Sequence, residues 1–389
     1  MQLPSRRSSW LPCLSLLAAC AAPPRGLQPV VSATERTAFA VDLGGWTSQA
    51  ELVRPTAGGV HGAGPWPTVL LIHGNGPHDM DVTLRGPDGE TRMFAAIAEH
   101  LAARGFAVVR YHKRWVKAPG RFDARFWREQ STFVFTDDAG KVLDAALALP
   151  GADPARLVLY GWSEGTAVAA ALAARRGDID ALVLQGVVGL PWREMVRGWI
   201  LDTGLPYAAS AAGPVTADSL GAALRGNGGV VAKLGASFFA DPAARQRGEV
   251  RVSPLLDRDG DGALDPAQEV RPAIEAMLDF AFGPQGNLYV YAPDRAVPTV
   301  TEQAPALHRL PLLVLQGQND ASTPPAGAQR VAAAWRAAGG TDITVLELGD
   351  RGHMLGRAAA PVDDLARPID PGVLDAAAVW LLRVTAAAR

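Results

Sequence analysis

The sequence contains little cysteine and no surplus of positive charge. Two cysteines, Cys13 and Cys20, occur among 389 residues. We expect Cys13 to be removed with an N-terminal processing segment, which leaves no pair for an intramolecular disulfide. Lysine and arginine (37) are balanced by aspartate and glutamate (39), the net charge is −2, and no basic stripe is present. Because binding to phosphates normally requires a basic surplus or stripe, nucleic acid is excluded as the main ligand.

The N-terminus resembles that of an exported precursor. Two arginines precede an apolar run from Trp10 to Ala19, which is too short to span a bilayer. The residues Leu17-Ala18-Ala19-Cys20 resemble a bacterial lipobox, which implies cleavage before Cys20 and lipid attachment to it. We therefore expect a lipoprotein signal peptide at 1–19, a tether at 20–33, and a protein held on a membrane of the bacterial cell envelope. An ordinary signal peptide with a chance cysteine is the alternative.

Apolar runs of strand length alternate with alanine-rich helical patterns over 34–190 and again over 307–389. The run Thr68–His73 is continuously apolar, which indicates a strand buried on both faces. The alternation predicts an α/β fold with a mostly parallel, doubly wound sheet. It is lost over 191–306, which we interpret as an inserted cap. We expect strands at 37–43, 50–54, 68–73, 106–111, 156–160, 181–188, 311–316 and 343–348, and helices at 93–104, 139–149, 165–175, 326–338 and 373–385.

One serine stands where a strand should turn into a helix. The pattern Gly161-Trp162-Ser163-Glu164-Gly165 is typical of a nucleophile elbow, in which glycines leave room around an exposed hydroxyl. Asp320 follows the first core strand after the cap, and His353 follows the last strand. We expect His353 to act as the base for Ser163 and Asp320 to orient the imidazole. Asp350 is a rival for the acid, and a surface histidine or a turn aspartate are the alternatives to these roles.

An acyl-transfer site also needs donors for an oxyanion. The elbow supplies the backbone N–H of Glu164, at the start of a helix. The loop after the first buried strand should supply the N–H of Asn75, with Gly76 next in line. The Glu164 carboxylate is either a second acid or a helix-start charge. Lys113 and Arg114 are expected to form a structural charge pair or a solvated edge, with a role as substrate clamps as the alternative.

Three segments together carry a resemblance to a known family. His73–Asp79, Ala103–Arg114 and Gly161–Gly165 resemble the HGSGPxDRD loop, the YDKRG segment and the GHSEGG elbow of bacterial serine esterases of the α/β-hydrolase superfamily. The chain order Ser, Asp, His agrees with this resemblance. The match covers most of the core but not the cap, and it departs from the family pattern at Asn75, Met80, His112, Trp115 and Trp162.

The resemblance implies a cofactor-free serine carboxylesterase that cleaves small or medium acyl esters through an acyl-enzyme. A peptidase or thioesterase of the same fold remains an alternative, because one fold and one triad serve many substrates. A non-catalytic binding lipoprotein on the same scaffold is the second alternative.

The cap contains an acidic loop. Its carboxylates alternate around a glycine, as in an EF-hand calcium loop. We expect a structural calcium site formed by Asp257, Asp259, Asp261, Ala263, Asp265 and Glu269. The closing position itself holds Gln268, so Glu269 comes one residue late, and an acidic solvated turn is the alternative.

Replacing Cys20 tests the predicted anchor. In the full-length precursor, Cys20→Ser should release the protein from membranes or block its processing, because the thiol that carries the lipid is lost. Fractionation of membranes and soluble protein, with Cys13→Ser as the matched control, checks this. Unchanged membrane association of Cys20→Ser would exclude lipidation at that residue.

Overall fold

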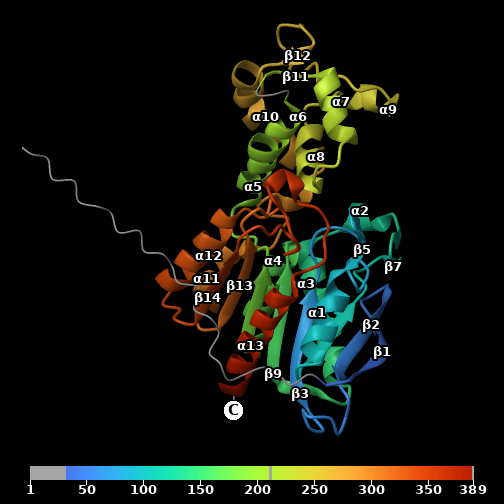
Figure 1. Ribbon diagram of the computed structural model, residues 1–389, viewed down its shortest axis with the longest axis vertical. Coiled ribbons are helices and arrows are strands. Elements are labelled where there is room, and N and C mark those ends of the chain that lie inside the picture. Colours follow the sequence, from blue (N-terminus) through green and yellow to red (C-terminus); the bar gives the residue numbers. More distant parts are fainter. Residues whose placement is uncertain (1–31, 210–212, 388–389) are drawn as a thin grey trace, which may run out of the picture.

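The computed structural model describes residues 32–209 and 213–387 (Figure 1). The predicted signal peptide, Cys20 and all but the last two residues of the predicted tether lie outside these ranges. Within them, no helix combines the length and the apolar character needed to cross a membrane.

A single eight-stranded sheet forms the centre of the core. Its order is β1-β2-β6-β3-β9-β10-β13-β14. Seven of these strands run in one direction, and β2 runs in the opposite direction. This confirms the mostly parallel sheet that the alternation predicts. The strands are β1 (Thr34–Asp42), β2 (Thr47–Pro55), β3 (Trp66–Ile72), β6 (Ala107–Tyr111), β9 (Ala152–Trp162), β10 (Ala181–Gln185), β13 (Leu312–Gly317) and β14 (Ile343–Leu348).

Helices cover both faces of this sheet, as Figure 1 shows. Side chains alternate along β3, so Leu70 and Ile72 belong to one hydrophobic cluster while Val69 and Leu71 belong to the other. The first cluster includes side chains of α3 (Thr132–Leu147), α4 (Glu164–Arg176), α11 (Val300–Leu307) and α12 (Pro325–Ala337). The second includes side chains of α1 (Met93–Ala102) and α13 (Pro371–Ala387). A continuously apolar strand is thus required because both of its faces are covered.

Two elements differ most from the expected bounds. Helix α3 begins at Thr132 rather than 139, since Phe135 is buried in the core and tertiary packing outweighs the low helix propensity of the Thr-Phe-Val-Phe start. Strand β9 extends from Ala152 to Trp162, and its first residues pair with the start of β3.

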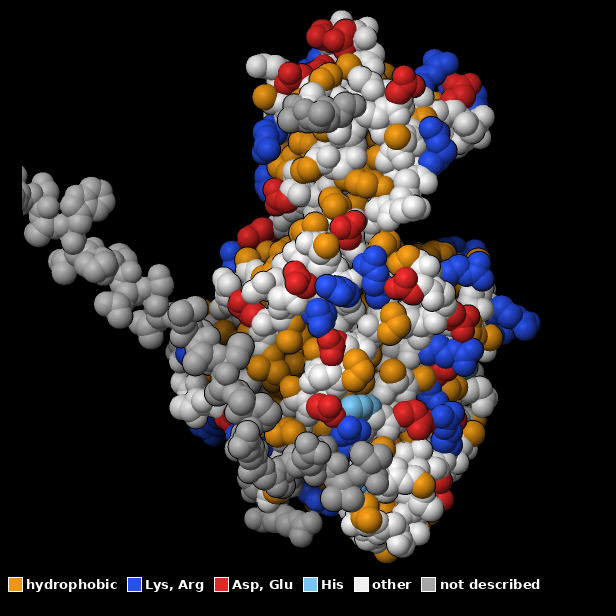
Figure 2. Space-filling model, in the orientation of Figure 1, with side chains coloured by type: hydrophobic (Ala, Val, Ile, Leu, Met, Phe, Trp, Pro, Cys, Tyr) orange, Lys and Arg blue, Asp and Glu red, His pale blue; other side chains and the backbone are white. Residues whose placement is uncertain are grey.

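The cap follows β10 and has its own hydrophobic cluster. Figure 2 shows it as a separate mass joined to the core by a narrower waist. Its elements are α5 (Trp192–Gly198), η1 (Trp199–Gly204), α6 (Leu205–Ala208), β11 (Val215–Thr216), α7 (Ala217–Arg225), α8 (Val230–Ser237), α9 (Pro242–Gln246), β12 (Ala263–Leu264), η2 (Pro266–Val270), α10 (Arg271–Phe282) and η3 (Tyr289–Tyr291). Helix α11 packs against α4 and α12, so the chain has returned to the core before the expected boundary at 306.

Short elements complete the chain. They are β4 (Thr83–Gly86), β5 (Gly89–Arg92), β7 (Val116–Ala118), β8 (Arg121–Phe122), α2 (Arg125–Glu129) and η4 (Pro361–Asp363).

Candidate active site

Ser163 occupies a strained turn between β9 and α4. Its φ is 57° and its ψ is −127°, a conformation that costs a non-glycine residue about 1–3 kcal/mol. A Cβ added to Gly161 would lie 2.4 Å from the Gly165 carbonyl oxygen, and one added to Gly165 would lie 2.3 Å from the Ile72 carbonyl oxygen. No side chain fits at either glycine, which explains the spacing of the pattern around the serine.

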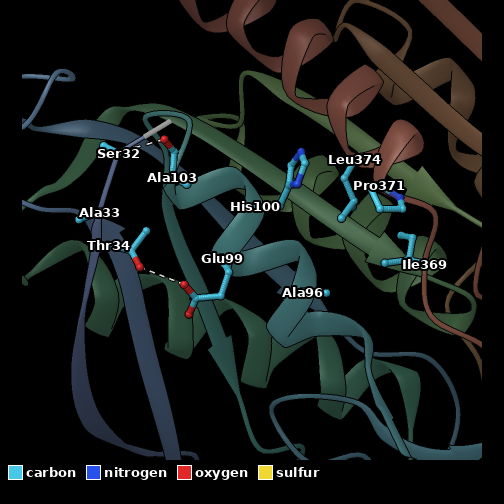
Figure 3. A pocket seen from close by; sticks show the side chains of 10 residues that line it. All are labelled: Ser32, Ala33, Thr34, Ala96, Glu99, His100, Ala103, Ile369, Pro371 and Leu374. Atoms are coloured by element: carbon cyan, nitrogen blue, oxygen red, sulfur yellow. Dashed lines mark hydrogen bonds between the residues drawn. The ribbon is translucent and has the colours of Figure 1, made fainter. Parts of the chain in front are cut away.

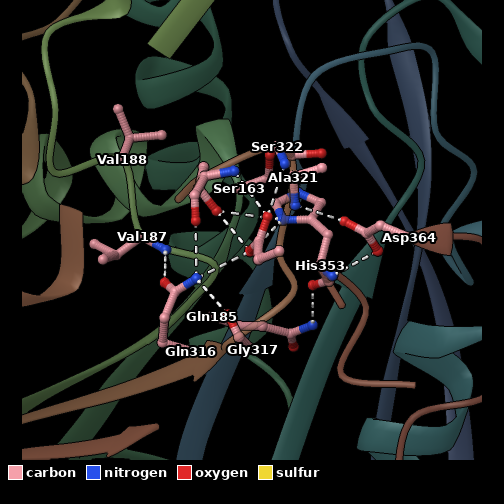
Figure 4. Close-up of polar contacts among 12 residues, drawn as sticks. Ser163, Gln185, Val187, Val188, Gln316, Gly317, Ala321, Ser322, His353 and Asp364 are labelled. Carbon is pink, nitrogen blue, oxygen red and sulfur yellow. Dashed lines mark hydrogen bonds and ion pairs between the residues drawn. The ribbon is translucent and has the colours of Figure 1, made fainter. Parts of the chain in front are cut away.

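His353 lies at the same end of the sheet as Ser163. The Ser163 N–H donates to the Gln185 carbonyl oxygen (2.9 Å) at the end of β10. A Cβ added to the following residue, Gly186, would lie 2.8 Å from the His353 ring, and the Trp162 and His353 ring centroids are 5.4 Å apart. Figure 4 draws Ser163 and His353 in one cluster of polar residues.

The structure brings His353 onto Asp320, as expected. The distance from His353 Nδ1 to Asp320 Oδ2 is 2.9 Å, and both side chains are buried. Asp320 Oδ1 accepts the N–H groups of Ser322 (2.9 Å) and Thr323 (2.8 Å), and Oδ2 accepts the Thr323 hydroxyl (2.8 Å). The Gln316 side-chain amide of β13 also donates to Oδ2 (3.2 Å). Because the strand, the turn and the imidazole all bond to this carboxylate, its direction is fixed.

The rival Asp350 has no hydrogen bond to His353 among the described contacts. Its backbone has a φ of 52°, and its carbonyl oxygen accepts bonds from Ala358 and Arg351. The geometry therefore favours Asp320 as the partner of the imidazole.

Burial lowers the pKa of His353, but contact with the Asp320 carboxylate outweighs burial, and the pKa lies above its usual value of 6.5. The Asp364 carboxylate contributes to the same rise. Asp364 accepts the backbone N–H groups of His353 (2.8 Å) and Ala321 (2.9 Å), so it ties together the loops that carry His353 and Asp320 (Figure 4). Burial and the nearby Asp320 raise the pKa of Asp364 to about 6.

Sequence reasoning missed Asp364. It stands beside Asp363 in a loop after the last strand, and no local pattern distinguishes the two carboxylates. Asp364 gains its role only because the loops that carry His353 and Ala321 approach each other in the folded chain.

The expected oxyanion donors come from two different elements next to the serine. Glu164 begins α4, and the loop with Asn75 and Gly76 follows β3. A Cβ added to Gly74 would lie 2.9 Å from the Ser163 Cβ, so this loop is in contact with the turn at Ser163. Gly76 has a φ of 108°, which favours glycine, and His78 Nε2 lies 2.5 Å from the Asn75 carbonyl oxygen.

Lys113 and Arg114 each pair with a different buried carboxylate. Lys113 Nζ lies 2.9 Å from Glu164 Oε1, and Arg114 Nε lies 2.7 Å from Asp138 Oδ2. Neither is a solvated edge. Glu164 is therefore held by an ion pair as well as by its position at a helix start.

The acidic loop of the cap gathers three of its expected ligands. Single carboxylate oxygens of Asp257, Asp259 and Asp261 lie within 4.8 Å of one another. Asp265 instead caps the next turn, accepting the N–H groups of Ala267 and Gln268, and Glu269 accepts those of Arg258 and Asp265. Calcium binding by this loop, including the Ala263 carbonyl, stays a prediction.

One hollow on the surface lies away from these residues. It has a volume of about 490 Å³ and lies between β1, α1 and the start of α13 (Figure 3). Glu99 in its wall accepts the Thr34 hydroxyl (2.9 Å) and also pairs with Arg36. None of the predicted site residues lines it.

Comparisons with known proteins support the architecture. No family model matches the sequence. Over 53 residues, 14% of this chain, the sequence is 49% identical to esterase EstD of Thermotoga maritima, and the match spans only 12% of that protein. The proline iminopeptidase of Mycobacterium smegmatis aligns with 91% of this chain and 100% of its own at 19% identity, with a TM-score of 0.51. Est1E of Butyrivibrio proteoclasticus with bound ferulic acid aligns with 90% of this chain and 100% of its own at 15% identity, with a TM-score of 0.49. The chain has the α/β-hydrolase fold.

The raised pKa of His353 predicts an acidic limb of activity with a midpoint above 6.5, because the base must be neutral. Asp320→Asn removes the main cause of the rise, so the midpoint should fall below 6.5 and kcat should drop by about 10⁴-fold. The effect of the ion pair on folding has the opposite sign: its stabilisation is full below pH 6.5 and is lost as pH rises through the raised pKa. Profiles of kcat/KM and melting against pH measure both.

Asp350→Asn is the matched control for this pH test. It should leave the acidic limb in place. If Asp350→Asn moves the limb and a folded Asp320→Asn does not, the role of the acid belongs to Asp350.

Calcium in the millimolar range should stabilise the cap. If the loop binds with a Kd on the order of 10⁻⁴ M, millimolar calcium adds about 1.4 kcal/mol. The double variant Asp259→Asn/Asp261→Asn should abolish this increase, while each asparagine keeps an oxygen for the turn's N–H bonds. Calorimetric titration and melting with and without chelator check this, with exposed Asp279→Asn as the control. No heat of binding at millimolar calcium would return the loop to an acidic turn.

Proposed function

We propose that the protein is a serine hydrolase, and specifically a carboxylesterase that cleaves small or medium acyl esters through an acyl-enzyme. Ser163 is the nucleophile, His353 takes its proton and later returns it to the leaving group, and Asp320 orients and stabilises the imidazole. The backbone N–H groups of Glu164 and Asn75 bind the oxyanion, with Gly76 next to them.

The observation that carries this proposal is the 2.9 Å contact between His353 and Asp320 at the carboxyl ends of the strands, where Ser163 occupies the strained turn. A buried histidine with its Nδ1 on a carboxylate presents Nε2 as the base, which a surface histidine would not do. The stretch shared with an esterase supports ester chemistry over peptide or thioester cleavage.

Membrane attachment through Cys20 and a structural calcium ion in the cap belong to the same proposal. Neither takes part in the chemistry at Ser163. A lipid anchor would keep the hydrolase at the envelope surface. The balanced charge of the chain favours a small ester over a nucleic acid as its substrate.

Ser163→Ala should abolish ester hydrolysis and labelling by a fluorophosphonate probe. Loss of one triad member costs about 10⁴-fold or more in kcat, and only an activated serine reacts quickly with the probe. Ser237→Ala on α8 of the cap is the matched control and should keep full labelling. Circular dichroism confirms that each variant folds.

The same assay separates the alternatives. A panel of matched esters, thioesters and aminoacyl amides should show the highest kcat/KM for esters. Labelling that persists in Ser163→Ala would exclude this nucleophile, and a folded wild-type protein that is neither labelled nor active would leave a binding protein.

A further inference from the structure

A buried ion pair includes Glu164, the residue that directly follows Ser163. Lys113, just after β6, and Glu164, the first residue of α4, are 3% and 2% exposed, and their charged atoms are 2.9 Å apart. The aromatic ring of Phe135 lies over the ammonium at 4.0 Å. Breaking such a pair leaves an uncompensated buried charge, so this arrangement is fixed.

Lys113 also holds the loop that follows β3. Its Nζ donates to the Gly74 carbonyl oxygen at 2.7 Å. This carbonyl and the N–H of Asn75 belong to one planar peptide unit, which is trans, and in a trans unit the C=O and N–H point in opposite directions. Holding the carbonyl on the lysine side therefore turns the Asn75 N–H away from Lys113.

The peptide unit that Lys113 holds is in contact with the serine. An ideal Cβ on Gly74 would lie 2.9 Å from the Ser163 Cβ. A rotation of this unit would redirect the N–H beside the reacting hydroxyl, so the Lys113 bond acts on the direction of a donor rather than only on packing.

Lys113 compensates the negative charge of the Glu164 carboxylate, which lies close to the proposed oxyanion site. The N–H of Glu164 is expected to bind the oxyanion, while its own carboxylate is a negative charge close to the place where negative charge develops. In a buried site two like charges repel strongly. Lys113 compensates the carboxylate through Oε1, and Tyr291 of the cap donates its hydroxyl to Oε2 at 2.5 Å.

We propose that Lys113 is a positioning residue for the oxyanion site: through the Gly74 carbonyl it directs the Asn75 N–H, and through Glu164 it fixes the start of α4 and neutralises its carboxylate. This inference rests on the proposed hydrolase function. Tyr291 holds the second oxygen of Glu164 and thereby ties the cap to the same point.

The central variant is Lys113→Met, which keeps the length of the side chain and removes the ammonium. It should lower kcat by about 10²-fold while KM changes by less than about threefold, because an oxyanion donor acts mainly in the transition state. A boronic acid that forms a tetrahedral adduct with Ser163 should bind more weakly by a similar factor. Amide hydrogen exchange over 73–77 should become faster.

Three further variants keep the test decisive. Lys113→Met/Glu164→Gln removes both charges, so it should fold even if Lys113→Met does not, and it should still show the low kcat and the faster exchange.

Asp138→Asn is the matched control, because it breaks the neighbouring buried pair with Arg114. Arg114 does not contact Gly74, so this variant should lower the melting temperature while kcat stays within about twofold. Tyr291→Phe should have a smaller effect on kcat than Lys113→Met, since the Gly74 contact remains.

Wild-type kcat and unchanged exchange over 73–77 in a folded lysine variant would overturn the proposal. An equal loss of kcat in Asp138→Asn would also overturn it, because the role would then be structural. If the wild-type protein shows no Ser163-dependent hydrolysis, the proposed function fails, and the exchange measurement alone still decides whether Lys113 holds the loop.

Discussion

The strained turn at Ser163, with its close backbone contacts, is the constraint on which the site depends. At Ser163, which has a positive φ, the chain turns from β9 into α4. Gly161 of β9 lies against the backbone of α4, and Gly165 of α4 lies against the backbone of β3. The sheet supports this strain because β3, β9 and β10 lie side by side in its centre. The Ser163 hydroxyl, the helix start and the loop after β3 are consequently placed by one piece of rigid backbone rather than by three independent loops.

The sequence predicts the parts of this protein that follow from local pattern. Continuous apolar runs indicate buried strands. Ser163, Asp320 and His353 each follow the carboxyl end of a strand, of β9, β13 and β14 respectively, so their meeting at one end of the sheet could be expected before any coordinates. The start of α3 could not, because Thr132 and Phe135 gain their helical conformation from packing rather than from propensity. The roles of the three site residues in catalysis stay predictions.

Long-range pairing escapes sequence reasoning for a physical reason. Lys113 and Glu164 are 51 residues apart, and the sequence offers a charge pair or a solvated edge as equal possibilities. Burial decides between them, since a charge in the interior must have a partner. The same holds for Asp364, whose carboxylate matters only because two loops meet at its oxygens.

The place of the cap in the chain has a consequence for how such a protein can diverge. The cap leaves the core after β10 and returns before β13, and these two strands are neighbours in the sheet, so replacing the whole insertion would leave every pairing of the eight-stranded sheet intact. The exchange is not entirely free, however. The Tyr291 hydroxyl reaches Glu164, and the Trp199 indole donates to the Ser322 carbonyl oxygen (2.8 Å) next to Asp320. A transplanted cap would have to bring two donors to these points, which limits the pool of insertions that recombination could fix on this scaffold.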